Sequence, residues 1–356
     1  MSNRTAGYRA LTTHRLFWPV VVLVGMLAAN TVYRPGFLSV QMRDGHLYGS
    51  LIDILRLSAP LILVALGMTL VIATGGIDLS VGSLCAISGA IACLHISQQR
   101  DQNSIGGVLT ALALGLGVAL VLGAWNGVLV AVIGIQPIIA TLILMVAGRG
   151  LAQLITEGQI LTINSAPYKA IGVGHLLTLP LAIFLALAAA LLVAAVTRRT
   201  ALGLIIESVG GNAQASRLAG IRSARITFLV YVISAACAAV AGFMMTANVS
   251  SADGNAAGLW VELDAILAVV IGGTSLAGGR FSLGGTILGA LLIQTLTTTV
   301  YAMNISPQTS LLFKAVVVIA VCLIQAPGFR ARFTRRRAPT AGPTPATEQP
   351  KEQVPA

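Results

Sequence analysis

The chain has 356 residues, of which 56% are hydrophobic and only 9% are charged, against about 25% charged residues in an ordinary soluble domain. Eleven acidic residues and twenty-two lysines and arginines cannot cover a soluble core of this size, so the composition excludes a soluble protein and predicts an integral membrane protein surrounded by lipid. The net charge of +11 does not indicate nucleic acid binding, because the arginines gather before the first apolar run and behind the last one, as in cytoplasmic anchoring.

Ten apolar runs are long enough to cross about 30 Å of hydrocarbon at about 1.5 Å per residue. They begin near Leu16, Leu51, Leu79, Ile105, Pro137, Leu176, Arg225, Glu262, Phe281 and Thr309. We therefore predict an all-α fold, a polytopic transmembrane helical bundle of about ten spans. The count is open near Leu79, where the break is short, and over 105–134, which fits one tilted span or a span plus a surface segment. The first run, 16–33, lacks a clear cleavage site and is interpreted as a retained span.

The chain is expected to divide into three parts: a cytoplasmic N-terminal segment (1–15), a transmembrane domain (16–326) with a cytoplasmic segment at 197–225, and a basic, then disordered cytoplasmic tail (327–356) rich in Pro, Ala and Thr. With the N-terminus inside, fifteen basic residues fall on the cytoplasmic side and five on the outer side. This asymmetry predicts that both termini are cytoplasmic.

Within the apolar chain, the stretch ATGGIDLSVGS (73–83) carries two adjacent glycines, an aspartate and two serines. Gly75 and Gly76 are expected to interrupt a span, and Asp78 to cap the helix that follows from Leu79 by accepting hydrogen bonds from free backbone N–H groups. Irregular backbone at membrane depth is tolerated only where protein or a water-filled cavity shelters it, so this stretch is expected to abut a translocation path.

Other ionisable residues within the runs are costly in lipid and usually face a cavity or a partner. Arg149 lies near the outer end of its helix and is expected to reach the interface. Glu262 and Asp264 begin a helix, where acids favour the positive end of the helix dipole, and Lys314 lies within the last run. GIDLSVG (76–82) and ELDAILA (262–268) share an acidic helix start with opposite expected directions, so an inverted repeat is possible.

The most polar internal segment, TRRTALGLIIESVGGNAQASRLAGIRSARIT (197–227), is too polar to span and is flanked by basic clusters. It predicts a short helix, a turn at Gly210 and Gly211, and a second short helix capped by Asn212. An ordinary loop and a docking helix for a partner protein both fit this pattern.

Nucleotide and metal chemistry are not indicated. The phrase GTSLAG (273–278) is followed by Gly279 and Arg280, where a phosphate-binding loop needs Lys and then Ser or Thr. The four cysteines lie in apolar runs without a Cys-x-x-Cys pair and are expected to be apolar filler. We therefore expect no cofactor, no metal site and no catalytic residue.

Four phrases identify a family. They are GMTLVIATGGIDLSVGS (67–83), IQPIIATLILMVAGRGLAQLIT (135–156), the segment 201–221 and NAAGLWVELDAILAVVIGGTSLAGGRFSLGGT (255–286). Over about residues 50–326 the chain resembles the permease subunits of ribose-type sugar ABC importers, and LYGSLIDIL, ATLILMVAGRG and NAAGLWVELDAILAVVIGG most resemble a galactofuranose permease.

The resemblance implies a non-catalytic transport subunit in the bacterial inner membrane that moves a sugar, with galactofuranose preferred over ribose or another monosaccharide. Its implied partners are a cytoplasmic ABC ATPase subunit, a periplasmic sugar-binding protein and a second, related permease chain. The segment 201–221 corresponds to the ATPase contact, and the positions carried over are Glu207, Gly210, Asn212, Ala215 and Gly220. Ser208 and Ser216 depart from the small apolar residues expected there.

A sugar path needs hydrogen-bond donors and acceptors together with occasional aromatic faces. The expected lining residues are Thr74, Asp78, Trp125, Asn126, Gln136, Thr141 and Trp260. An ion-coupled carrier or channel is an alternative, but it would leave the docking-type segment unexplained. An intramembrane aspartyl protease built on Asp78 and Asp264 is disfavoured, because the two acids are expected to enter from opposite faces.

Overall fold

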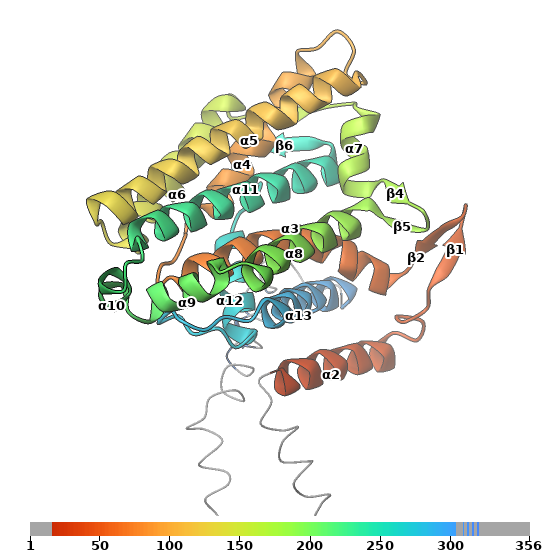
Figure 1. Ribbon diagram of the computed structural model, residues 1–356. Helices are drawn as coiled ribbons and strands as arrows, with labels where there is room; N and C mark the ends of the chain where they lie inside the picture. The colour runs from red at the N-terminus through yellow and green to blue at the C-terminus, as the bar shows by residue number, and fades with distance from the viewer. Residues whose placement is uncertain (1–15, 304–308, 310–311, 313–314, 317–318, 320–356) are drawn as a thin grey trace, which may run out of the picture.

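The computed structural model describes residues 16–303 together with residues 309, 312, 315, 316 and 319 (Figure 1). The N-terminal segment 1–15, most of the predicted last span with Lys314, and the tail 327–356 lie outside the described residues, as does Cys322. The described chain is mostly helical, as predicted.

The helices follow the predicted order, and each boundary is set by local signals. Ser104 and Ser282 cap two of them by accepting from the N–H groups of Gly107 and Gly285, and Pro137 occupies the first turn of a third. The helices are α2 (Phe17–Tyr33), α3 (Ser50–Ala73), α4 (Val81–Ser97), α5 (Ile105–Val128) continued by η1 (Leu129–Ile133), α6 (Pro137–Ile155), α7 (Ala166–Val173), α8 (Leu181–Arg199), α9 (Leu202–Gly211), α10 (Ala213–Leu218), α11 (Ser223–Val249), α12 (Val261–Ile271) and α13 (Leu283–Ala302).

Six of the described helices are long and apolar enough to cross a membrane: α3, α5 with η1, α6, α8, α11 and α13. The predicted count of about ten spans is therefore not confirmed. The open question at 105–134 is resolved, because 105–133 forms one continuous 29-residue span. The run predicted to begin near Leu176 begins instead at Leu181, because Pro180 and a hairpin precede it.

The all-α prediction needs one small correction, because three two-stranded antiparallel ribbons occur in the connections. Their strands are β1 (Gln41–Arg43) with β2 (His46–Tyr48), β3 (Ile160–Thr162) with β6 (Ser251–Asp253), and β4 (His175–Leu176) with β5 (Leu179–Pro180). The β3–β6 pair ties the chain after α6 to the chain after α11, with Leu161 opposite Ala252.

The core is centred on α3 and α11, which pack on each other; α11 also packs on α4, and α3 also packs on α13. In α3, 78% of the apolar window is buried, against 22% in α5 and in α8. The outer helices therefore turn apolar faces toward the lipid, as expected for a bundle whose solvent is hydrocarbon. Helix α2 joins the bundle through Asn30, whose Nδ2 donates to Thr299 Oγ1 of α13 at 2.7 Å.

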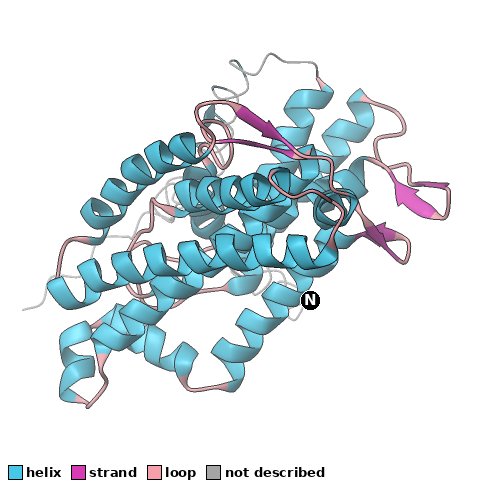
Figure 2. Ribbon diagram, turned by 90° about the horizontal axis from the view of Figure 1, so that it is seen from above, coloured by secondary structure: helices cyan, strands magenta, loops and turns pink. Residues whose placement is uncertain are grey.

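The bundle has two distinct ends (Figures 1 and 2). The coupling end, at the left in Figure 1, holds α9, α10 and the turns that follow α3 and α12. The hairpin end holds β1–β2, β4–β5, α7 and the β3–β6 ribbon. Described arginines and lysines divide between these ends as predicted: 198, 199, 217, 222, 225 and 280 at the coupling end, and 34, 43, 56, 100 and 169 at the hairpin end.

Two ring side chains join the ribbons at the hairpin end. His46 and His175 stack with centroids 4.2 Å apart, and the N–H of Leu47 donates to the carbonyl oxygen of Thr178 at 2.9 Å. Burial lowers the pKa of His175, and so do the nearby His46 and Arg56, because each disfavours a proton on its ring.

Candidate functional site

The segment after α8 forms two short helices at the coupling end, as the sequence predicts. The Asn212 side chain accepts from the N–H of Ala215 at 2.9 Å and so caps α10, which confirms the predicted cap. The predicted glycine turn is wrong in detail. Gly210 and Gly211 continue α9, and the break lies at Asn212, whose backbone is extended. Gly220, with φ of +87°, ends the second helix in the left-handed region that favours glycine.

The segment's outer surface is partly apolar. Of the five residues predicted to contact an ATPase, Asn212, Ala215 and Gly220 are exposed, whereas Glu207 and Gly210 are half-buried. Beside them, Leu204 is 71% exposed and Leu218 is 87% exposed. These two leucines were not singled out from the sequence, and they add exposed apolar side chains to the outer surface of the segment.

Of the two serines expected to depart from the family pattern, Ser208 is exposed and Ser216 is buried. The Ser208 hydroxyl donates within its own helix to the carbonyl oxygen of Leu204 at 2.8 Å. Ser216 therefore lies beneath the segment's outer surface, and only Ser208 could meet a partner directly.

The inner side of the segment meets a junction of three backbones. A Cβ added to Gly210 would overlap the carbonyl oxygen of Ala73 and lie 2.7 Å from the Gly279 nitrogen. That same nitrogen donates to the Ala73 carbonyl oxygen at 3.0 Å. A Cβ on Gly278 would lie 2.8 Å from the Gly210 carbonyl oxygen and 3.0 Å from Gly75. We call Ala73, Gly75, Gly210, Gly278 and Gly279 the glycine junction.

The glycine junction connects three parts of the chain. It brings together the end of α9, the turn that follows α3 and the turn between α12 and α13. Because these contacts are backbone against backbone, side-chain rotation cannot absorb a displacement of α9. The end of α9 is therefore in direct backbone contact with the turns that follow α3 and α12.

After the junction, the chain turns back into the bundle before α4 begins. Gly67 of α3 packs on Ser234 of α11, and Asp78, eleven residues further along the chain, also contacts Ser234. Residues 76–80 are therefore a non-helical strip at the depth of Gly67, which agrees with the predicted break in the span. Thr141 of α6 donates to the Ile77 carbonyl oxygen at 3.2 Å and shelters this backbone.

Asp78 is 1% exposed and accepts three hydrogen bonds. Its Oδ1 accepts from the Ser80 N–H at 3.0 Å and from the Ser80 hydroxyl at 2.6 Å, and its Oδ2 accepts from the Ser234 hydroxyl at 3.0 Å. The predicted cap is therefore displaced: α4 begins at Val81, two residues later than expected, and Asp78 holds Ser80, the residue just before the helix. Asn126 of α5 completes the cluster by donating to Ser80 Oγ at 2.9 Å.

The predicted path residues do not form one continuous lining. Asp78, Asn126 and Thr141 meet in the buried cluster, and Thr74 lines a cavity of about 160 Å³ between that strip and α10. Gln136 is exposed at the coupling end, and Trp125 is exposed on the outside of α5. Trp260 is 52% exposed at the start of α12, far from the coupling end.

The buried cluster also contains residues that the sequence analysis missed. Ser234 and Tyr231 lie on α11, and the Tyr231 hydroxyl stands against Gly76, whose Cβ would come within 2.7 Å of it. No sequence signal distinguishes these two residues, because a serine and a tyrosine are ordinary members of a long apolar helix.

The acids that open α12 have different surroundings. Glu262 is buried, and its Oε2 has no hydrogen-bond partner in the described part of the chain. It lies against Gly82 of α4, so α4 and α12 meet near their first turns while running in opposite directions. The prediction that Arg149 simply reaches the membrane interface is wrong. Its Nη1 turns inward and donates to the Ala257 carbonyl oxygen at 2.5 Å, which ties α6 to the loop before α12.

The remaining expectations concern cysteines and metals. Cys85, Cys93 and Cys237 are free and buried in the apolar core, as expected for filler. Among the described residues there is no group of three or more His, Cys, Asp and Glu side chains that could hold a metal ion.

Comparison with known proteins identifies the family of this chain. Residues 50–322 match the profile of the family described as "branched-chain amino acid transport system / permease component". The chain is 47% identical to the galactofuranose transporter permease protein of Escherichia coli over 322 residues, covering 88% of this chain and 92% of that one.

Two further relatives are named as permeases for other sugars. The chain is 41% identical to the fructose import permease protein of Bifidobacterium longum, covering 93% of this chain and 94% of that one. It is 36% identical to the ribose import permease protein of E. coli, covering 86% and 92%. No solved structure has significant similarity to the chain.

Proposed function

The chain belongs to the permease-component family of branched-chain amino acid transport systems, and on that premise we propose that it is the membrane subunit of an ABC importer that brings a sugar into the cell. The observation that carries the proposal is the α9–α10 segment, which offers exposed leucines outward and rests on the glycine junction inward. A subunit driven by a separate ATPase needs such a rigid docking surface.

Galactofuranose is the preferred substrate. The support is the 47% identity to a galactofuranose permease over most of both chains, which exceeds the 41% and 36% to the fructose and ribose permeases. Fructose, ribose or another monosaccharide is the alternative. The subunit itself does no chemistry, since ATP hydrolysis belongs to its partner and a sugar-binding protein delivers the substrate.

The first test uses the purified importer. We expect the complex of this chain with its ATPase, in lipid, to hydrolyse ATP several-fold faster when the cognate sugar-binding protein is added with galactofuranose than when it is added empty. Fructose and ribose serve as matched sugars. Stimulation by ribose or fructose and not by galactofuranose would reject the substrate, and no stimulation by any sugar would reject the importer assignment.

The docking surface has its own test in Leu218→Asp. Leu218 is 87% exposed on α10, so the charge costs nothing within the subunit but places a carboxylate in an apolar contact. We expect at least a tenfold loss of ATPase co-purification with normal membrane insertion. Leu177→Asp is the matched control, because Leu177 is 81% exposed at the opposite end. Equal recovery of the ATPase with both variants would remove α10 from the interface.

The same proposal predicts the orientation of the subunit in the membrane and its assembly with a second chain. The coupling end faces the cytoplasm of a bacterial inner membrane, both termini are cytoplasmic, and the hairpin end faces the periplasm. A second, related permease chain completes the pore. The open concave surface along α6, lined by Ala147, Gly150 and Leu154, supports a helical neighbour there, since small residues allow close helix approach in lipid. Co-purification of differently tagged copies distinguishes an identical partner from a related one.

A further inference from the structure

A partly open cavity of about 210 Å³ lies near the hairpin end, between α3, α7, α8, α11, α12 and α13. None of the path residues expected from the sequence lines it. It is smaller than the roughly 300–1,000 Å³ of pockets that hold drug-sized ligands, so it suits a ligand of about a dozen heavy atoms.

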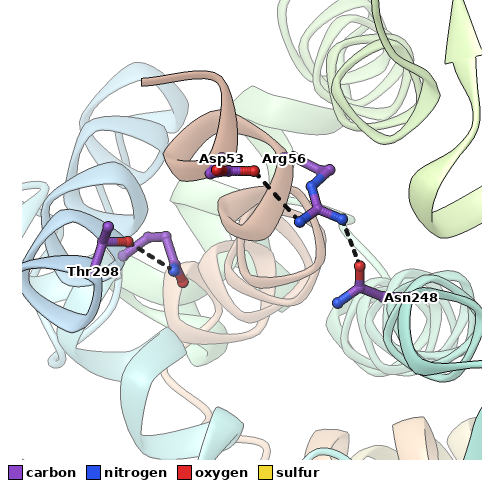
Figure 3. Close-up of polar contacts among 5 residues, drawn as sticks. Asp53, Arg56, Asn248 and Thr298 are labelled. Atoms are coloured by element: carbon purple, nitrogen blue, oxygen red, sulfur yellow. Dashed lines mark hydrogen bonds and ion pairs between the residues drawn. The ribbon is translucent and has the colours of Figure 1, made fainter. Parts of the chain in front are cut away.

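Four polar side chains from four different helices line the cavity: Arg56, Asn248, Asp264 and Gln294. Figure 3 shows the Arg56 guanidinium between Asp53 and Asn248. Its Nη1 donates to Asn248 Oδ1 at 2.7 Å, and its Nη2 approaches Asp53 Oδ1 at 3.4 Å. These contacts fix the position of the guanidinium and leave further N–H groups available to a ligand, because an arginine side chain carries five N–H donors.

The chemistry of this lining selects against simple ions. An anion attracted by Arg56 would meet the Asp264 carboxylate, and a cation attracted by Asp264 would meet the guanidinium. A neutral ligand that both donates and accepts many hydrogen bonds matches all four groups. Methionines 244 and 245 supply an apolar wall for its C–H surface.

We propose that this cavity is a sugar-binding site within the permease subunit, in which Arg56, Asn248, Asp264 and Gln294 hold the hydroxyl groups. The inference rests on the proposed function, which supplies the substrate class. A zwitterionic amino acid is the main competitor, because its carboxylate and ammonium groups could pair with Arg56 and Asp264. The sugar is favoured by the two amides, which match neutral hydroxyls, and by the relatives at 47% and 41% identity.

The site's position also connects it with the ATPase contact. Arg56 lies on α3 and Asp264 on α12, and both helices lead to the glycine junction at the other end of the bundle. The cavity and the ATPase contact are therefore linked through α3, which runs from Arg56 to Ala73. We expect sugar to be held weakly and to be released when the coupling end moves.

The test measures direct binding to the complex of this chain and its ATPase in lipid nanodiscs, without the sugar-binding protein. The probe is methyl β-D-galactofuranoside, titrated at millimolar concentration by saturation-transfer NMR. We expect saturable binding that weakens at least tenfold in Gln294→Leu and Asn248→Leu. Asn255→Leu is the matched control, because Asn255 is an exposed amide outside the cavity. Within the described residues the Gln294 side chain donates one long hydrogen bond, of 3.4 Å to Thr298, so we expect its replacement to leave the fold intact.

Three results would overturn the site. The first is the absence of galactofuranoside binding to the unaltered complex, and the second is equal galactofuranoside binding in all three variants. The third is saturable binding of L-leucine that Gln294→Leu and Asn248→Leu weaken while galactofuranoside does not bind. Stimulation of ATP hydrolysis by sugar-loaded binding protein is measured on the same preparation. If it persists while galactofuranoside binding is absent, the site fails and the importer assignment stands.

Discussion

Replacing Gly210 with alanine is expected to reduce sugar-stimulated ATP hydrolysis at least tenfold while the protein still inserts into the membrane. The added methyl group would overlap the Ala73 carbonyl oxygen and crowd the Gly279 nitrogen, and both atoms are backbone, so α9 must move outward. Overpacking of this kind costs about 1–3 kcal/mol. The measurement compares ATPase rates of purified complexes with and without sugar-loaded binding protein.

Gly211→Ala is the matched control for this prediction. The two glycines are neighbours in α9, and a Cβ on Gly211 meets nothing within 4 Å. Both substitutions gain about the same helix propensity, roughly 1 kcal/mol, so any difference between them comes from the glycine junction. Equal activity of the two variants would show that the junction does not transmit movement of α9.

Substitution of Asp78 is the second change with a large expected effect. Two variants separate the role of its hydrogen bonds from the role of its charge. Asp78→Asn keeps an acceptor for Ser80 and turns a donor toward Ser234, whose hydroxyl can accept instead. We expect this variant to retain most transport and thermal stability. Asp78→Ala leaves the buried partners unsatisfied at about 1–3 kcal/mol for each group, so we expect its melting temperature in detergent to fall by several degrees.

The control for Asp78 is Asp44→Asn, an exposed aspartate in the β1–β2 turn that should leave both measurements unchanged. The decisive outcome is transport by well-folded Asp78→Asn. Complete loss of transport with an unchanged melting temperature would assign Asp78 a charged role in the path, in place of the structural role that its three hydrogen bonds indicate.

Much of the fold follows from the sequence because apolar run length and helix caps are local signals. The starts of α5 and α6 were predicted at the residues where they occur, and Asn212 was predicted as a cap. The number of membrane spans was harder to predict. Val81–Ser97 and Val261–Ile271 are short because they start inside the bundle, and run length alone does not reveal the depth at which a helix begins.

The site was only partly predictable for a similar reason. Asp78 could be singled out because a carboxylate in an apolar run is conspicuous, but its partner Ser234 is 156 residues away and has no local mark. Gly210 was named from the family pattern, whereas its packing against Ala73 and Gly279 depends on three distant segments. The cavity near the hairpin end is a tertiary feature of this kind, formed by residues from six helices.

Helix α3 has a consequence for how the two faces of the membrane communicate. It is continuous over 24 residues, or about 36 Å at 1.5 Å per residue. One end follows the hairpin bonded to Thr178, and the other ends at Ala73. In the proposed importer, a sugar-binding protein that lands on the hairpins would act on one end of this helix, and the other end would support the ATPase contact. Pro60 lies within α3 and is the place where this helix can bend. The stiffness of this one helix would therefore determine how strongly binding at the hairpin end affects the position of the coupling end.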